Sequence, residues 1–206
     1  PEDVVQIKKF CEYFHPKLDE YNNLLTYNQI FVERTKNIGI IDLKTCFSYG
    51  LTGVMLRGTG FKWDLRKDIP YSIYKEVEFE VPVGTGQMGT LGDCWDRHWV
   101  RMAEMKQSLR IVEQLIDGIP EGPHKAKVGK TLKPPVGEAW SRTECPRGEL
   151  SFYLVSDGTP YPYRVKCKSP CFLNISTLDE ISRGVMVADL VATIGSLDIV
   201  LGEVDR

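Results

Sequence analysis

The chain has 206 residues, with 26 lysines and arginines against 28 aspartates and glutamates, so its formal net charge is −2. Hydrophobic residues make up 42% of it, an ordinary share for globular proteins, which excludes a disordered chain, a collagen and a coiled-coil rod. The near-neutral charge argues against nucleic acid as a partner, because nucleic-acid-binding domains carry a clear basic excess.

The first third of the chain predicts helices separated by glycine-rich bends. A loose apolar stripe favours a helix at residues 2–22, in which Pro16 is expected to produce a kink or a break. Short helices are expected at residues 29–35 and 43–49. Four glycines between residues 50 and 60 predict bends or close packing rather than a regular element.

The middle of the chain predicts one strand and one long helix. Alternating apolar residues at 74–83 favour a strand, although Pro82 argues against a central position in a sheet. Apolar residues at steps of three or four predict a helix at 93–117. Asp93 is its expected N-cap, and the glycine and proline that follow residue 117 end it.

The last third predicts a connection, a hairpin and two helices. Prolines and lysines at 122–137 indicate a surface connection, and strands are expected at 150–155 and 163–168 around an SDGTP turn. A helix capped by its first residue is expected at 177–183. Residues 185–194 are apolar nearly all round, which predicts a helix buried on most sides.

These elements predict an α+β fold that is mainly helical with a small antiparallel β-hairpin, and a single domain over residues 1–206. No apolar run is long enough for a membrane span, and charged residues interrupt the N-terminal segment, so no signal peptide is expected. The six cysteines contain no CxxC pair, which favours free thiols in a reducing compartment over a metal or iron–sulfur site.

Most short sequence motifs in the chain lack the context that their usual chemistry requires. Residues 84–89 (GTGQMG) match a dinucleotide-binding pattern, but the helix begins later and Asp93 and Asp96 at its start would repel a phosphate, so a flexible loop is expected. The GKT at 129–131 lacks the required earlier glycine. Asp189 stands alone in an apolar segment and needs a hydrogen-bonding partner if it is buried.

Several segments together resemble one known family over nearly the whole chain and in the same order. These segments are 53–60 (GVMLRGTG), 63–67 (WDLRK), 92–97 (GDCWDR), 146–149 (PRGE), 154–158 (LVSDG) and 198–206 (DIVLGEVDR). The family that they resemble is the large quinone-site subunit, of the D type, of NADH:quinone oxidoreductase, which is respiratory complex I. The resemblance implies that the chain corresponds to the C-terminal half of a longer family, without the N-terminal part.

The family is itself similar to the large subunits of nickel–iron hydrogenases, which implies a hydrogenase-large-subunit-like fold. The PRG segment at 146–148 matches theirs, whereas the terminal CxxC that binds their metals has no counterpart here. Because thiolates make that metal site, no metal is expected. By resemblance, the vacated pocket is the inner end of the quinone cavity.

The resemblance suggests three quinone-binding residues: Arg147 as a fixed cation, and Asp198 with Val200 in the terminal segment. A structural salt bridge is the alternative for Arg147, and a helix-end or turn carboxylate is the alternative for Asp198. No catalytic residue is assigned. Core packing and a buried ion pair are the expected roles of Trp63, Asp64 and Arg66.

The implied function is that of a quinone-site scaffold in a proton-pumping enzyme that passes electrons from NADH to quinone. Quinone is the substrate, and the NADH site, FMN and iron–sulfur clusters belong to partner subunits, with none bound by this chain. The expected partners are the small subunit with the terminal cluster, the membrane arm and the N-terminal half. The expected location is peripheral, on the cytoplasmic or matrix side of the energy-transducing membrane.

Two other classes remain open. One is the large subunit of a hydrogenase-related ion-translocating complex that uses ferredoxin or another electron donor. The other is a purely structural remnant whose partner half does the binding.

Overall fold

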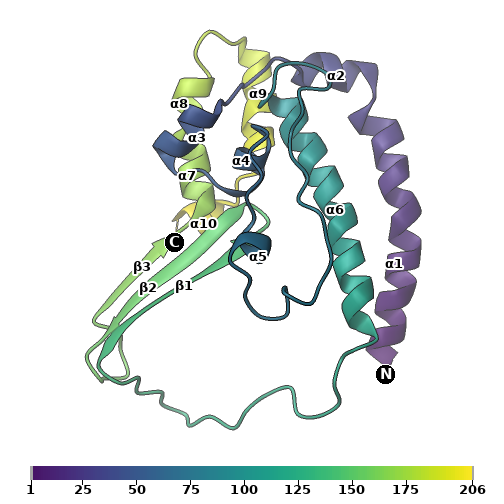
Figure 1. The fold of residues 1–206 in the computed structure, drawn as a ribbon. Coiled ribbons are helices and arrows are strands. Elements are labelled where there is room, and N and C mark those ends of the chain that lie inside the picture. The colour runs from purple at the N-terminus through teal and green to yellow at the C-terminus, as the bar shows by residue number, and fades with distance from the viewer. Residues whose placement is uncertain (1, 206) are drawn as a thin grey trace.

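A computed structural model describes residues 2–205, and Figure 1 shows a helical body from which a small sheet projects. The N-terminal part of the body contains α1 (Glu2–Tyr21), the π-helix η1 (Asn22–Thr26), α2 (Gln29–Thr35), α3 (Leu43–Tyr49), α4 (Gly53–Arg57), α5 (Leu65–Asp68) and α6 (Cys94–Ile116). The sheet and the C-terminal helices are β1 (Gly137–Cys145), β2 (Gly148–Ser156), β3 (Arg164–Lys168), α7 (Pro170–Ser176), α8 (Leu178–Ile181), α9 (Val187–Leu197) and α10 (Leu201–Asp205).

The helices α1 and α6 lie side by side and run in opposite directions (Figure 1). Their facing apolar stripes bury Cys11 and Leu18 of α1 against Met102 and Leu109 of α6. The predicted helix at 2–22 is confirmed, but the expected break at Pro16 is wrong. Pro16 lies on the exposed side of α1, where a backbone carbonyl that lacks an amide partner is free to bind water.

The irregular turn comes later, at η1, and side chains of α6 hold it. The indole Nε1 of Trp95 donates to the carbonyl of Thr26 at 2.9 Å, and the hydroxyl of Thr26 lies 2.9 Å from Nε2 of His98. Burial lowers the pKa of His98 to about 4, so this imidazole is neutral at pH 7. The π turn is therefore anchored to the start of the long helix.

The segment at 74–83 is not a strand, so that prediction is wrong: residues 74–76 belong to a turn, and residues 77–83 have no regular structure. Val77, Phe79 and Val81 pack on Ile111 of α6, which explains their alternation. The backbone amide of Glu78 donates to the side-chain carbonyl of Gln114 at 2.9 Å, and other glutamine contacts follow along α6. Helix side chains thus occupy hydrogen-bonding groups that a neighbouring strand would otherwise bind.

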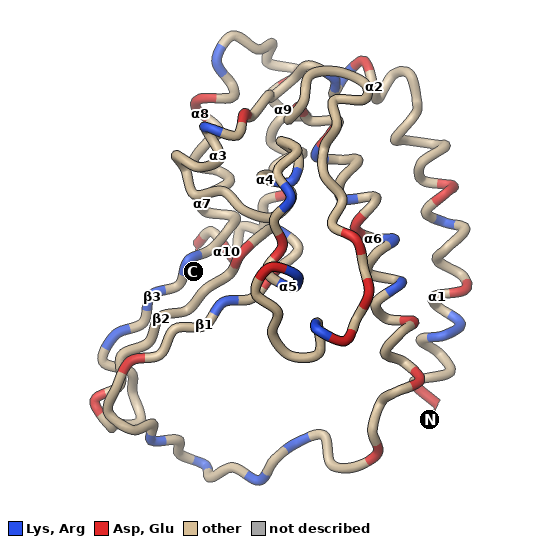
Figure 2. The backbone as a smooth tube through the Cα atoms, in the orientation of Figure 1, with Lys and Arg blue, Asp and Glu red and all other residues tan. Residues whose placement is uncertain are grey.

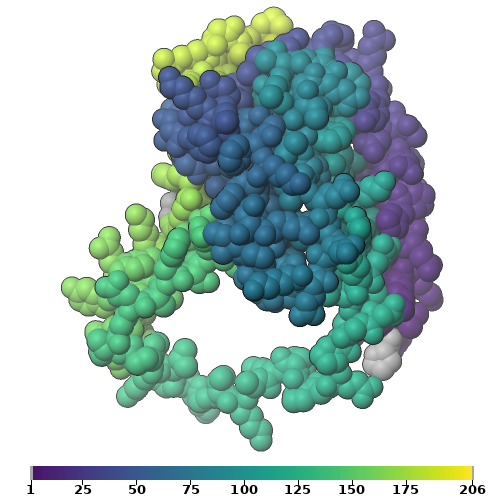
Figure 3. All heavy atoms as spheres, in the orientation of Figure 1, coloured from purple at the N-terminus to yellow at the C-terminus, as the bar shows by residue number. Residues whose placement is uncertain are grey.

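The sheet has three antiparallel strands in the order β1-β2-β3, one more than the predicted hairpin. β1 pairs with β2 over its full length, and Pro146 and Arg147 form the two-residue connection between the paired residues Cys145 and Gly148. The surface connection predicted at 122–137 is confirmed as an exposed segment through residue 136. Its basic residues are spread along its length (Figure 2), and an open window separates it from the body (Figure 3).

The helix α9 presents its polar side to the body and its apolar side to solvent, so the prediction of a helix buried on most sides is wrong for this chain. Asp189 is buried and pairs with Arg34 of α2 at 2.7 Å, which supplies the expected partner. The fully buried Arg97 of α6 donates to Ser196 Oγ at 2.8 Å. Val187 and Val191 are 86% and 73% exposed. These polar contacts, together with the buried Leu197 at its end, fix this helix on the body.

Two further helical predictions need correction. The glycine-rich stretch at 50–60 contains the short helix α4, between Thr52 and Gly58. The helix predicted at 177–183 is shorter, because α8 covers Leu178–Ile181, and the hydroxyl of Thr177 donates back to Asn174 instead of capping it. The unpredicted α7 begins after Ser169, whose side chain accepts from the amide of Phe172.

Candidate functional site

A cavity of about 460 Å³ lies where α6, the β1–β2 connection and the segment after α9 meet. Met105, Cys145 and Pro146 give it apolar and sulfur surface. The rest of its wall is strongly charged, with three guanidinium groups and three carboxylates. These belong to Arg57, Arg66, Arg101, Glu104, Glu144 and Asp198. Such a mixture of a few charged groups and apolar surface suits a small ligand with polar ends.

Arg147 and Asp198, which are 51 positions apart in sequence, meet at this cavity. Nη2 of Arg147 donates to Oδ1 of Asp198 at 3.0 Å, and Nε donates to the backbone carbonyl of the same residue at 3.3 Å. Asp198 lines the cavity, whereas Arg147 reaches it through Asp198. The two residues chosen from the sequence are thus in direct contact, and their role in binding stays a prediction.

Asp198 also connects Arg147 to α6, through a contact with Arg101. Its Oδ2 lies 3.5 Å from Nε of Arg101, a nitrogen that makes no hydrogen bond to any atom of residues 2–205. Nη2 of Arg101 donates instead to the backbone carbonyl of Ser196. Asp198 ends α9 with a φ of 54°, a left-handed conformation that a non-glycine residue seldom adopts. Contacts to two arginines hold it there.

Val200 follows Asp198 by two positions but does not line the cavity. Its side chain is 40% exposed, and its backbone amide donates to Sγ of Cys171 at 3.4 Å. Glu203 fixes the same segment, because its carboxylate accepts from Ser169 Oγ at 3.0 Å and from Cys171 Sγ at 2.9 Å. The terminal segment after Asp198 is therefore attached to the start of α7 by polar contacts.

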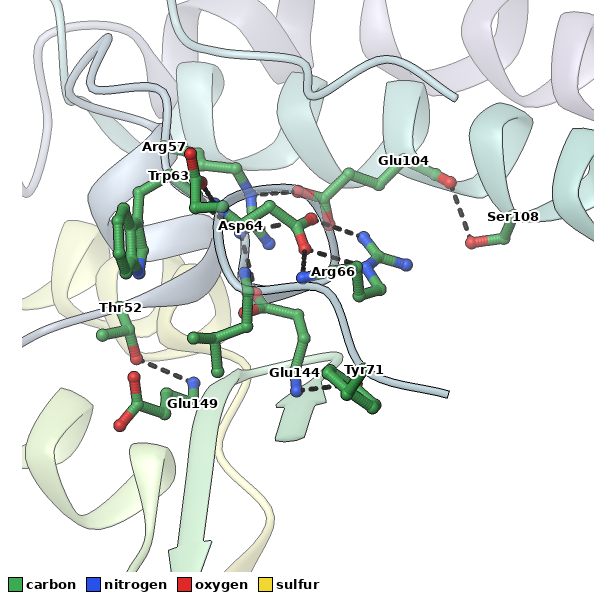
Figure 4. A network of polar contacts seen from close by, with 12 residues as sticks. Thr52, Arg57, Trp63, Asp64, Arg66, Tyr71, Glu104, Ser108, Glu144 and Glu149 are labelled. Carbon is green, nitrogen blue, oxygen red and sulfur yellow. Dashed lines mark hydrogen bonds and ion pairs between the residues drawn. The ribbon is translucent and has the colours of Figure 1, made fainter. Parts of the chain in front are cut away.

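A buried ionic network, shown in Figure 4, supplies several of the charged residues that line the cavity. Arg57, 1% exposed, donates from Nε to Glu104 at 2.5 Å and from Nη1 to Glu144 at 2.8 Å. Arg66 binds Asp64 through two bonds of 2.9 and 2.6 Å. This confirms the predicted ion pair of Asp64 and Arg66, and it adds Arg57 and the two glutamates, which sequence reasoning missed.

Burial and charge act differently on Asp64 and Glu144, the two most buried carboxylates of this network. Burial opposes ionisation of Asp64, but the bonds from Arg66 outweigh it and hold the pKa of Asp64 below its usual value. Burial raises the pKa of Glu144 in spite of the neighbouring Arg57. The sequence signal that could have revealed this network is Arg57, because it is a charged residue within an apolar run that is flanked by glycines.

Close backbone packing holds the β1–β2 connection against α4. The Cα of Gly148 lies only 2.4 Å from where a Cβ of Gly53 would stand, and the φ of Gly53 is +65°. Thr52 Oγ1 accepts from the backbone amide of Glu149 at 2.8 Å. The cation of Arg147 is consequently carried on a connection with little freedom to move.

The glycine loop at 84–89 closes on a carboxylate of the chain itself. Asp96 of α6 accepts from the backbone amides of Gly86 and Gly92, each at 3.1 Å. Asp93 caps α6, as predicted, and accepts from the amide of Asp96 at 2.9 Å. The amides that would bind a phosphate in a dinucleotide site therefore bind Asp96, and the loop is well fixed rather than flexible.

The described chain is thus an α+β unit that encloses a charged cavity, with an arginine-bearing connection against the segment that follows α9. Residues 1–135 and 124–206 match the family model of the respiratory-chain NADH dehydrogenase 49 kDa subunit, and the chain belongs to that family. Within residues 2–205 no helix is both long and apolar enough to cross a membrane.

Three relatives illustrate the similarity, and each is the D-type subunit of an NADH-quinone oxidoreductase. The second such subunit of Solibacter usitatus is 52% identical over 98% of this chain and 53% of its own length. The relative from Chlorobaculum tepidum is 50% identical over 98% of this chain and 51% of its own length. The relative from Desulforamulus reducens is 50% identical over 96% and 53% respectively. The chain spans about half the length of these relatives.

Proposed function

We propose that this chain forms one wall of the site at which an NADH-quinone oxidoreductase reduces quinone. The observation that carries the proposal is the contact of Arg147 with Asp198 at the edge of the charged cavity. Family membership gives the reaction class, because the relatives are named for NADH-quinone oxidoreduction. The NADH site, FMN and iron–sulfur clusters are on partner subunits, and quinone is the molecule that meets this chain.

The chemistry of the cavity suits a quinone. Its ring has apolar faces, for which Met105 and Pro146 provide surface, and two carbonyl oxygens that accept hydrogen bonds. Reduction places negative charge on those oxygens, and fixed cations nearby stabilise it. Arg101 is positioned for this role, because its Nε lacks an acceptor among the described residues and it lines the cavity.

The assembly in which the chain works tests the reaction class. We expect the chain to co-purify with a flavin-containing subunit that oxidises NADH, with a small subunit carrying the terminal iron–sulfur cluster, and with membrane subunits. A preparation that holds an intact membrane arm but no NADH-oxidising flavin subunit would contradict NADH as the donor. It would favour a hydrogenase-related complex that uses another donor.

Asp198→Asn is expected to lower kcat/KM for quinone about fivefold in the assembled complex. The substitution keeps the shape of the side chain but removes the charge that joins Arg101 and Arg147. These groups are partly exposed, so the lost interaction is worth about 1 kcal/mol. Steady-state quinone reduction at matched complex levels measures the effect.

Asp179→Asn is the matched control, because Asp179 of α8 forms an exposed ion pair with Arg183. We expect its kinetics to equal those of the unchanged enzyme. Equal kcat/KM and inhibitor response in the two variants would remove Asp198 from the site.

Val200→Met is expected to change inhibitor sensitivity or the KM for quinone more than it changes assembly. Val200 is an apolar residue beside Asp198, and its exposed side chain leaves room for the larger methionine. Titration with a quinone-site inhibitor at matched complex levels is the measurement. Val128→Met, in the exposed connection after α6, is the control. An unchanged inhibitor response and KM would remove Val200 from the site.

A further inference from the structure

The side chain of Cys145 lines the charged cavity. The chain has six cysteines, all of them within residues 2–205, and no other cysteine belongs to the wall of this cavity. Cys167, on β3, is half-buried like Cys145 but does not line the cavity. The remaining four are buried, namely Cys11, Cys46, Cys94 and Cys171. A small molecule that enters the cavity therefore meets one thiol.

The position of this thiol is fixed by the backbone around it. Cys145 is the last residue of β1 and pairs with Gly148 across the two-residue connection. Gly148 in turn packs closely on Gly53, which leaves the end of β1 little freedom to move. Pro146 and Met105 line the same cavity and give it apolar surface. A flat ring that binds on such surface lies in the same cavity as the thiol.

The cavity also contains a buried polar group that lacks an acceptor. Arg101 lines the cavity, and its Nε is buried but makes no hydrogen bond to any atom of residues 2–205. Burial lowers the pKa of Arg101 to about 10, so the guanidinium group is still charged at pH 7. A buried donor without an acceptor is costly, so it indicates that a ligand supplies an acceptor oxygen here.

We propose that Cys145 is a covalent attachment site for flat α,β-unsaturated carbonyl compounds that bind in the cavity, including quinones with hydrogen on a ring carbon. Where the compound is a quinone, this inference rests on the proposed quinone site. The sulfur forms a bond to the ring carbon, and the π electron pair of that C=C bond moves onto a carbonyl oxygen. That oxygen takes the thiol proton. The proton of the attacked carbon then moves to the second oxygen, which leaves a hydroquinone thioether.

The charges of the cavity favour this addition for a bound molecule. Negative charge develops on the carbonyl oxygen as the sulfur adds, and the cation of Arg101 stabilises it. Burial raises the pKa of Cys145, and Glu203 and Glu144 act in the same direction, whereas Arg147 opposes them. The thiol is therefore protonated at pH 7 and reacts slowly with a reagent that only collides with it. Binding in the cavity supplies the proximity that the reaction needs.

The experiment treats the assembled complex with 1,4-naphthoquinone in the absence of NADH and maps the adducts by peptide mass spectrometry. The rate of modification of Cys145 is expected to saturate as the naphthoquinone concentration rises, and to fall about tenfold when a quinone-site inhibitor is present. The rate at Cys167 should rise linearly and ignore the inhibitor. After the excess reagent is removed, kcat for quinone reduction should be lost in proportion to the adduct on Cys145.

Two controls separate the covalent step from binding. The compound 2,3-dimethyl-1,4-naphthoquinone has methyl groups on both ring carbons that sulfur would attack, so it should protect Cys145 without forming the adduct. In Cys145→Ser, whatever quinone reduction the variant retains should survive treatment with 1,4-naphthoquinone. In Cys167→Ser, the loss of activity should be the same as in the unchanged chain. The mapping of adducts uses the unchanged chain, so it does not depend on how well either variant assembles.

A Cys145 that stays unmodified while Cys167 reacts, or that reacts at a rate linear in reagent concentration, would overturn the attachment site. If it stays unmodified while Asp198→Asn and Val200→Met have their expected effects, the attachment site fails and the quinone site stands. If Cys145 reacts with saturation, but the inhibitor gives no protection and quinone reduction survives, the attachment site stands and the quinone site fails.

Discussion

Arg57→Met is expected to lower the free energy of unfolding by roughly 3–5 kcal/mol, because it leaves buried carboxylates without their shared cation. Arg57 is 1% exposed and contacts Glu104, Glu144 and the carbonyl of Trp63. Methionine fills much of the space but donates nothing. The measurement is the amount of this chain in the assembled complex and the temperature at which it becomes sensitive to protease.

A second substitution separates charge from packing. Arg57→Met combined with Glu144→Gln removes one of the stranded charges, so the double variant should regain part of the lost stability. Arg110→Met, at an exposed arginine of α6, is the control for loss of a surface cation and should change little. A double variant as unstable as Arg57→Met alone would show that packing, not charge, makes Arg57 necessary.

Gly53→Ala is expected to cost roughly 2–5 kcal/mol of stability, combining overpacking with a left-handed backbone. The added Cβ would stand 2.4 Å from the Cα of Gly148, a contact that cannot persist without moving the β1–β2 connection. Arg147 would move with that connection. We therefore expect a higher KM for quinone in whatever complex still assembles, measured at matched complex levels.

Gly50→Ala is a closely matched control. Gly50 has a φ of +67°, nearly the same as Gly53, but nothing lies within 4 Å of where its Cβ would stand. It should therefore show only the conformational part of the loss and leave the KM unchanged. Equal losses in the two variants would contradict the role of the Gly53–Gly148 contact.

The sequence predicted best those elements whose signals are local. The helices at 29–35 and 43–49 match α2 and α3, and α6 begins after Asp93. N-cap residues mark where these helices begin. Asp42 accepts a hydrogen bond from the backbone amide of Thr45 at 2.7 Å, and Asp93 accepts one from the backbone amide of Asp96. A short polar side chain before an apolar run carries the necessary information within a few residues.

The errors arise where distant partners decide the outcome. The alternation at 74–83 is real, but the surface it covers is α6, and glutamines replace a strand as hydrogen-bond partners. The helix α9 has an apolar composition, yet Arg34 and Arg97 bind its polar side. Neither arrangement follows from the local pattern, because Arg97 lies 99 positions before Ser196, and Arg34 lies still further from Asp189.

The residues of the candidate site also fall into a predicted group and a missed group. Resemblance to a family pointed to Arg147 and Asp198, which do meet, and to Val200, which lies beside them. The buried ionic network around Arg57 was missed, except for the ion pair of Asp64 and Arg66. Glu104 and Glu144 look like ordinary solvent-facing residues of a helix and a strand, and only the packing of α4 between them makes them partners of Arg57.

The glycine loop at 84–89 has its acidic ligand within the same chain, because its backbone amides donate to Asp96. A carboxylate that is covalently part of the chain is always present at high local concentration, whereas a dissolved phosphate must compete for the same amides from dilute solution. Asp96 therefore occupies the amides of this loop in the folded chain. The glycines of this pattern thus fit a carboxylate of the protein itself.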